Sequence, residues 1–213
     1  MASVSEQPFR AEPAVTPAQR WPANPAPLGL AGFGITTLVL SLINANLISG
    51  ADTPVVLGMA LAYGGIAQFM AGMWEFRAGN VFGAAAFSTY GAFWISFFIL
   101  VSFDAAKIPA AHAGTAVGAY LWAWGLITAM FFLCTFRAPR ALSLLFALLT
   151  ATYVLLAIGS DGPSTTVTHI GGYVGIATAV NALYLVLAFV MEGVYERPIL
   201  PVGVPAPATG RRG

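Results

Sequence analysis

The residues of this chain that could do chemistry are mostly uncharged hydroxyls and amides set within strongly apolar stretches. Groups of this kind hydrogen-bond small polar solutes, and in lipid they need partners of some sort. Two interpretations of these side chains stay open. They form hydrogen bonds between packed helices, or they line a polar, uncharged path through a bundle. The residues concerned include Thr36, Thr37, Ser41, Asn44, Gln68, Ser88, Thr89, Tyr90, Ser96, Thr152, Tyr153, Thr178 and Asn181.

Ionisable side chains, in contrast, lie at the ends of the apolar stretches. Glu75 and Glu192 stand at one set of ends, and Asp52, Asp104 and Asp161 at the other. No carboxylate stands near the middle of a stretch, where proton-coupled transporters often carry one. The sequence contains no nucleotide-binding loop, metal cluster or nucleophile–base pair. We therefore expect no enzyme activity, no metal and no cofactor.

The elements that must position the polar side chains are six apolar stretches. A helix needs about 20 mainly apolar residues to cross the hydrocarbon core of a bilayer. Only 8% of the residues are charged, against roughly a quarter in soluble domains. The sequence predicts an all-α membrane protein, a six-transmembrane-helix bundle in a lipid bilayer, with the fifth span the shortest. The spans run roughly Leu28–Ser49, Val55–Trp74, Val81–Phe103, Ala116–Phe136, Ala141–Ile158 and Ile170–Met191.

Basic residues set the orientation of these spans. With six crossings, Arg77, Arg137, Arg140 and the arginines of both terminal segments fall on one side, and Lys107 alone falls on the other. The positive-inside rule then places both termini in the cytoplasm. We expect a disordered cytoplasmic tail at residues 1–23, a transport domain at 24–197 and a second, Pro- and Gly-rich cytoplasmic tail at 198–213. The net charge of +1 argues against nucleic acid as a partner.

A ten-residue motif begins just before the first span. Residues 24–33 read Asn-Pro-Ala-Pro-Leu-Gly-Leu-Ala-Gly-Phe, which closely resembles the hallmark of the acetate uptake transporters, the family of the succinate–acetate permease. Further blocks at 63–68, 79–83, 86–94, 155–159 and 200–203 are similar to later parts of that family. The resemblance covers about residues 24–203. The longer amino-terminal tail and Asn181 depart from the pattern.

The resemblance implies a function. Family members move acetate, and some move succinate or other short carboxylates, across the plasma or inner membrane. They are described both as proton symporters and as anion channels, and they resemble hexamers in which each subunit has its own path. The resemblance also implies an apolar constriction formed by Phe33, Tyr90 and Leu149, and a position linked to substrate size at Ala182.

The proline-containing entry to the first span suggests where a carboxylate would bind. Pro25 and Pro27 disfavour ordinary helix, so the backbone N–H groups around Leu28 to Leu30 would form an exposed helix start that attracts anions. We therefore expect substrate contacts at this entry and one polar residue farther along the span. The expected set is Asn24, Pro25, Leu28, Gly29, Leu30 and Asn44. The alternative is that Asn24 only caps the helix.

A different class of function is a membrane sensor that binds acetate and signals through its tails. The tails carry no long charged or helical module that would couple to a partner, which disfavours this alternative. Between symport and passive conduction, the sequence does not choose.

Overall fold

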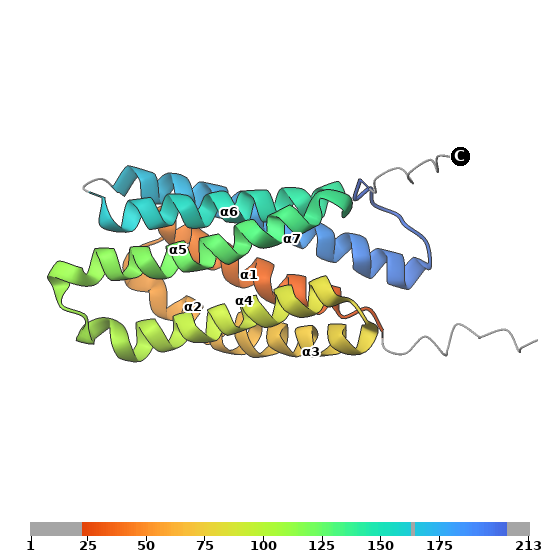
Figure 1. The fold of residues 1–213 in the computed structure, drawn as a ribbon, viewed down its shortest axis with the longest axis horizontal. Helices are drawn as coiled ribbons and strands as arrows, with labels where there is room; N and C mark the ends of the chain where they lie inside the picture. The colour runs from red at the N-terminus through yellow and green to blue at the C-terminus, as the bar shows by residue number, and fades with distance from the viewer. Residues whose placement is uncertain (1–22, 163–164, 204–213) are drawn as a thin grey trace, which may run out of the picture.

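The computed structural model describes residues 23–162 and 165–203. In this part of the chain, six helical segments are long and apolar enough to cross a membrane (Figure 1). The expected all-α bundle is confirmed, although the spans differ in their bounds. The helices are α1 (Ala26–Asn44), α2 (Thr53–Leu61), α3 (Gln68–Ala78), α4 (Val81–Ile99), α5 (Ala110–Cys134), α6 (Arg140–Asp161) and α7 (Thr165–Tyr195).

The second and third spans each contain a π-helical turn. The turn η3 (Ala62–Ala67) joins α2 and α3 into one span, Gly50–Ala78. The turn η4 (Leu100–Asp104) continues α4 into the short η5 (Ala105–Lys107). Single π-turns within helices often occur at functional sites, and η3 lies where the second span crosses α1. A Cβ atom added to Gly32 of α1 would lie 2.5 Å from the carbonyl oxygen of Tyr63 in η3.

The first span is shorter than the sequence predicts. It ends at Asn44 rather than near Ser49, because Asn46 adopts a left-handed conformation with a φ of 58°. Asparagine tolerates this conformation better than most residues. The first span, with 19 residues, is therefore shorter than the fifth, with 21, so the prediction that the fifth is the shortest is wrong.

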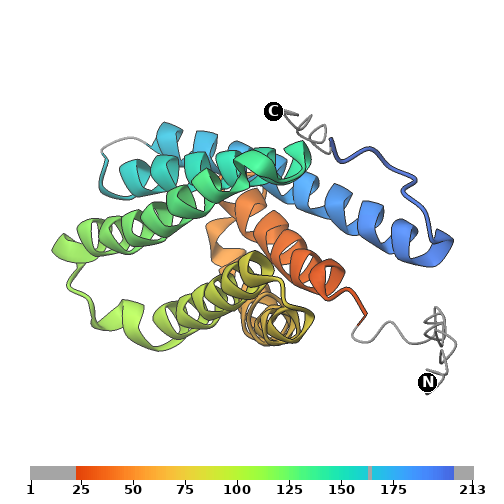
Figure 2. The ribbon, with the colours of Figure 1, turned by 45° about the vertical axis from the view of Figure 1, so that its right-hand side comes forward.

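The helices pack in a spatial order that differs from their order in the chain. Helix α3 packs against α4, α1 packs against both α3 and α7, and α7 is followed by α6 and then α5. In Figure 2, α1 runs between the layer formed by α5, α6 and α7 and the layer formed by α2, α3 and α4. Small residues allow the close α1–α7 approach: a Cβ on Gly34 would lie 3.3 Å from the Cβ of Ala182.

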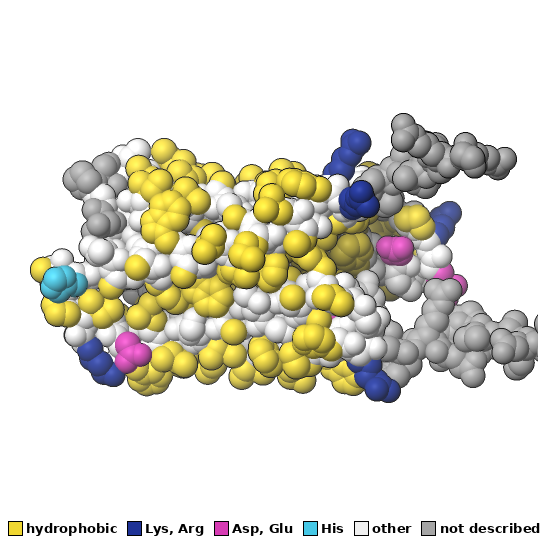
Figure 3. Space-filling model, viewed as in Figure 1, with side chains coloured by type: hydrophobic (Ala, Val, Ile, Leu, Met, Phe, Trp, Pro, Cys, Tyr) yellow, Lys and Arg dark blue, Asp and Glu magenta, His cyan; other side chains and the backbone are white. Residues whose placement is uncertain are grey.

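Charged side chains gather at the two ends of the bundle. Apolar side chains cover much of the visible flank, with basic groups concentrated at one end (Figure 3). The first and last described residues also lie at this end (Figure 1). Arg77, Arg137 and Arg140 lie at the same end, because they stand between spans that return the chain to it. Lys107 lies at the opposite end, where its Nζ is 2.7 Å from Oδ1 of Asp104. The segregation agrees with the predicted orientation, and the cytoplasmic placement of the basic end stays a prediction.

The boundary expected at residue 197 does not match the end of the folded part. The backbone N–H of Arg140 donates to the carbonyl of Gly203 (2.9 Å), and that of Ala141 donates to the carbonyl of Val202 (3.1 Å). The Tyr184 hydroxyl donates to the carbonyl of Pro201 (2.7 Å). Residues 201–203 are thus docked on α6 and α7 rather than forming a tail. The tails expected at 1–22 and 204–213 lie outside the described residues.

Candidate functional site

Among the described residues, the bundle encloses a cavity toward each of its ends. The cavity at the Lys107 end, here called the outer cavity, has a volume of about 290 Å³. The cavity at the arginine-rich end, here called the inner cavity, has a volume of about 230 Å³. Side chains from α1, α4 and α6 line both of them, so the two cavities follow one another along the same interior path.

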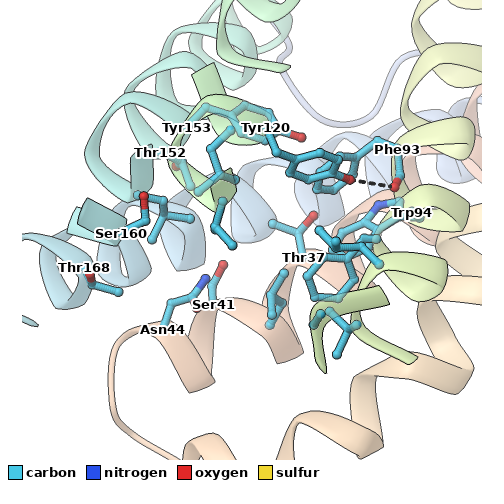
Figure 4. A pocket seen from close by; sticks show the side chains of 18 of the residues that line it. Thr37, Ser41, Asn44, Phe93, Trp94, Tyr120, Thr152, Tyr153, Ser160 and Thr168 are labelled. Carbon is cyan, nitrogen blue, oxygen red and sulfur yellow. Dashed lines mark hydrogen bonds between the residues drawn. The ribbon is translucent and has the colours of Figure 1, made fainter. Parts of the chain in front are cut away.

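The outer cavity is apolar with a scatter of hydroxyls and amides. Thr37, Ser41 and Asn44 of α1 face Ser160 and Thr168 across it (Figure 4). Among its described lining residues there is no Asp, Glu, Lys or Arg. Polar residues that line it are Thr37, Ser41, Asn44, Trp94, Tyr120, Thr152, Tyr153, Ser160 and Thr168.

Both interpretations of the polar residues apply within this cavity. Some side chains bond between helices: the hydroxyls of Thr152 and Thr178 are 3.2 Å apart, and Tyr120 lies 2.8 Å from Ser96. Among the described residues that line this cavity, two have a buried polar atom without a hydrogen-bond partner, Oγ1 of Thr37 and Nε1 of Trp94. Buried polar groups are nearly always hydrogen-bonded, so these two atoms are candidates to contact a passing solute.

The inner cavity differs from the outer one in that its lining includes a carboxyl group. Its lining includes Asn24, Gln68, Glu75, Asn80 and Tyr90. Both Oε1 of Gln68 and Oε1 of Glu75 are buried without a hydrogen-bond partner. The sequence placed Glu75 only at the end of a span, and it did not show that the carboxyl turns inward. A hydropathy pattern reports depth along the helix but not which way one side chain faces, so no signal in the sequence identified it.

The three residues that the family resemblance assigned to an apolar constriction lie where the two cavities adjoin. Phe33 and Leu149 line both cavities, while Tyr90 lines the inner one. The three residues come from α1, α6 and α4. The rings of Phe33 and Tyr90 are 5.8 Å apart between centroids. The Tyr90 hydroxyl donates to Oγ1 of Thr128 (3.0 Å), which points the polar tip of Tyr90 toward α5. The structure therefore brings the three predicted residues together in space.

The exposed helix start expected at the entry is absent. Helix α1 begins at Ala26, whose N–H donates to Oδ1 of Asn24 (3.0 Å). Pro27 has no N–H, and the N–H groups of Leu28 and Gly29 donate to the carbonyl of Pro25 (3.1 and 3.3 Å). The expectation of free backbone donors at Leu28 and Gly29 is wrong, because the Asn-Pro turn itself accepts from them. The alternative, that Asn24 caps the helix, agrees with the structure in that Asn24 accepts from the N–H of Ala26, although the N-cap residue is Pro25.

The six expected substrate contacts do not form one site. Asn24 and Leu30 line the inner cavity, whereas Asn44 lines the outer cavity at the other end of α1. Leu28 is exposed, and Gly29 is packed against the ring of Phe87. Pro25 is the N-cap residue of α1. The side chains of Asn24 and Asn44 therefore belong to opposite ends of the path.

Ala182, the position linked to substrate size, is fully buried where α7 meets α1. It is not among the residues that line either cavity. Its Cβ faces Gly34, the residue after Phe33. A substitution at Ala182 would therefore reach the constriction through α1 rather than by direct contact.

Six apolar spans around two adjoining interior cavities define a multi-pass membrane protein of the transporter or channel class. Residues 8–200 match the model of the GPR1/FUN34/yaaH family, and the chain belongs to this family.

Two relatives and one solved structure show how close the similarity is. The succinate-acetate/proton symporter SatP of Escherichia coli K12 is 38% identical over 181 residues, covering 85% of this chain and 95% of the relative. Acetate permease A of Emericella nidulans is 37% identical over 205 residues, covering 89% and 69%. The solved structure of the bacterial acetate channel SatP superposes with a TM-score of 0.79 at 37% identity, covering 85% of this chain and 99% of that one.

Proposed function

We propose that this protein carries acetate and other short carboxylates such as succinate across the cytoplasmic (inner) membrane, in which it is a multi-pass protein. The observation that carries the proposal is that Phe33 and Leu149 line both the outer and the inner cavity. One interior path thus runs toward both ends of the bundle and is narrowed by apolar side chains at a single level. The names of the relatives, a succinate-acetate symporter and an acetate permease, give the substrate class.

The cavities suit a small carboxylate. Their volumes of about 290 and 230 Å³ lie at or below the lower end of the range for drug-sized ligands. Hydroxyl and amide groups hydrogen-bond a carboxylate without the strong binding of a fixed cation, and a solute that is to be released must not bind strongly. The Thr37 hydroxyl and the Trp94 N–H can donate to a carboxylate and have no partner within the described protein, whereas the unpartnered Oε1 of Gln68 can accept only from the O–H of the neutral acid.

The ring formed by Phe33, Tyr90 and Leu149 is the proposed gate. An apolar constriction opposes ions by dewetting, and it opposes a bare carboxylate more than the neutral acid because burying an unpaired charge is costly. This favours passage together with a proton. Conduction of the anion through a ring that transiently wets is the alternative, and the names of the relatives include both a proton symporter and a channel.

Flux of labelled acetate into liposomes that hold the purified protein tests the proposal. A pH gradient and a membrane potential are imposed separately: symport responds to the pH gradient, and conduction of the anion responds to the potential. Empty liposomes and liposomes with heat-denatured protein are the controls. Absence of protein-dependent flux would contradict the proposal and favour the acetate-sensor alternative.

The assembly that we propose is a homohexamer with one path in each subunit. The proposal rests on the family resemblance, and the broad apolar flanks of the subunit leave room for contacts with other copies as well as with lipid. Native mass spectrometry in mild detergent measures the oligomer directly. A monomer under conditions that retain acetate flux would contradict it.

A further inference from the structure

Glu75 is a buried acid on the wall of the inner cavity. It lies in the last turns of α3, and its side chain is 2% exposed, although its neighbours Phe76 and Arg77 are exposed. A buried carboxylate is costly unless an opposite charge or several hydrogen bonds compensate it. Within residues 23–162 and 165–203, Glu75 forms no ion pair, and the one ion pair is between Lys107 and Asp104 at the other end of the bundle.

The carboxyl is held in place by the turn between α3 and α4. The Asn80 side chain hydrogen-bonds to it, while Oε1 has no partner. The backbone of Gly83 leaves the space that the carboxyl occupies: a Cβ added there would lie 2.7 Å from Cδ of Glu75 and 2.5 Å from Nδ2 of Asn80. Asn80 itself is fixed, because its Oδ1 accepts from the N–H of Gly83 (3.1 Å). Glu75, Asn80 and Gly83 therefore together determine where the carboxyl lies.

The groups that face Glu75 across the inner cavity carry no charge. Helix α1 and its entry contribute Asn24, Ala26, Leu30 and Phe33 to the described lining, and the other walls are also uncharged. Tyr90 of α4 is the one further titratable residue in that lining. The charged residues of the same end, Arg77, Arg137, Arg140, Glu192, Glu196 and Arg197, are exposed and are not part of the described lining.

A carboxylate substrate that enters this cavity brings a second negative charge close to Glu75. Two carboxylates that share a poorly solvated site cannot both be ionised without a large cost, so the pair holds a proton. We propose that Glu75 is the proton-binding residue of the inner cavity, and that it shares one proton with the carboxylate of the substrate. The inference rests on the proposed function and names the residue that couples it to protons.

Sharing of the proton allows the acid to release its proton to Glu75 and leave the cavity as the anion. When acid arrives from the constriction, its O–H bond breaks as an O–H bond forms on Glu75, and the acetate anion leaves to the cytoplasm. The proton on Glu75 then passes to water at the mouth of the cavity, which regenerates the carboxylate. The reverse sequence carries acid outward.

Calorimetric titration of acetate into the purified full-length protein tests the inference. Titrations in two buffers of different ionisation enthalpy, at several values between about pH 5 and 8, give the number of protons taken up per acetate bound. We expect the unaltered chain to reach an uptake near one proton at some pH in this range. Glu75→Gln should bind acetate with no linked proton. Glu192→Gln, which removes an exposed acid from the same end, is the matched control and should behave like the unaltered chain.

Proton uptake that persists in Glu75→Gln, or acetate binding without proton uptake in the unaltered chain, would overturn the inference. If the unaltered chain shows neither acetate binding nor flux, the proposed function fails instead, so the two failures are distinguishable. Asn80→Asp is a second variant that does not depend on the folding of Glu75→Gln. Aspartate is also a good N-cap, and its charge beside Glu75 should move the pH of maximal proton uptake upward by about one unit. An unshifted maximum would count against Glu75.

Discussion

The ring of Phe33 lies 5.8 Å from that of Tyr90, and the planes of the two rings are inclined by 53°. Tyr90 is fixed from the other side, where its hydroxyl donates to Thr128 and Thr128 in turn donates to the carbonyl of Trp124 (2.7 Å). An apolar ring face is thereby held toward the path, and the polar tip is held away from it. This arrangement explains how a tyrosine can serve as an apolar wall.

Leu149→Ala tests the constriction. Leu149 is buried and lines both cavities, so its truncation should widen the path and admit carboxylates larger than acetate. It should also cost about 2–5 kcal/mol of stability, the range for soluble cores. The control is Leu185→Ala, which removes a buried leucine that lines neither cavity. Liposome flux of acetate and of longer carboxylates is measured beside thermal unfolding. If Leu149→Ala is destabilised but keeps the original substrate range, Leu149 is only a packing residue.

Tyr90→Phe separates the ring of Tyr90 from its hydroxyl. Because the hydroxyl bonds to Thr128 and not toward the path, acetate flux should stay within about twofold, and stability should fall by roughly 0.6–1.7 kcal/mol. Tyr90→Ala, which removes the ring, should broaden the substrate range. Flux assays and thermal unfolding of both variants provide the comparison. Loss of acetate flux in Tyr90→Phe would show that the hydroxyl contacts the substrate.

Asn24 can be tested for substrate binding apart from its role at the helix start. Asn24→Asp keeps the oxygen that accepts from Ala26, so thermal stability should change by less than about 0.5 kcal/mol. The added negative charge on the wall of the inner cavity should weaken acetate binding about tenfold. Asn24→Ala should lose about 1 kcal/mol of stability because the N–H of Ala26 loses its acceptor. Unchanged acetate affinity in a folded Asn24→Asp protein would remove Asn24 from the substrate path.

Labelling of single cysteines tests the orientation. In a background with Cys134→Ser, a cysteine at Lys107 should react with a membrane-impermeant maleimide from outside intact cells. A cysteine at Arg77, at the opposite end of the bundle, should react only after the membrane is opened. The reason is the segregation of basic residues to one end. The reverse labelling pattern would invert the predicted topology.

Gly32→Ala tests the close approach of α1 to the π-helical turn η3. The new Cβ would lie 2.5 Å from the carbonyl oxygen of Tyr63, which is backbone and cannot turn aside. We expect a loss of stability of about 1–3 kcal/mol, as for overpacking in other cores. Gly58→Ala is the control, since a Cβ there meets nothing within 4 Å, and it should be neutral or slightly stabilising. Thermal unfolding in detergent measures both, and equal stabilities would contradict the close packing.

Much of the architecture could be predicted from the sequence. The spans were found within a few residues at most ends, because the bilayer demands long apolar helices whatever their tertiary contacts. The largest differences, of five or six residues, lie at the starts of the second, fourth and sixth spans and at the end of the first, where Asn46 takes a left-handed conformation that hydropathy does not encode. The three residues Phe33, Tyr90 and Leu149 were found through the family motifs, and their meeting between two cavities could be seen only in the structure.

The sequence by itself determined the number of spans and their segregation of charge, because these depend on composition along the chain. The family followed from the motif at residues 24–33 and the later blocks that resemble it. The tertiary structure decided which faces line the path, because helices that are apolar on most sides do not reveal their inward face. It also decided that the N–H groups of Leu28 and Gly29 are bonded to Pro25, and that the carboxyl of Glu75 turns inward over Gly83. The first feature depends on the geometry of a turn and the second on a neighbouring helix. The apolar and polar pattern of the residues concerned predicts neither of them.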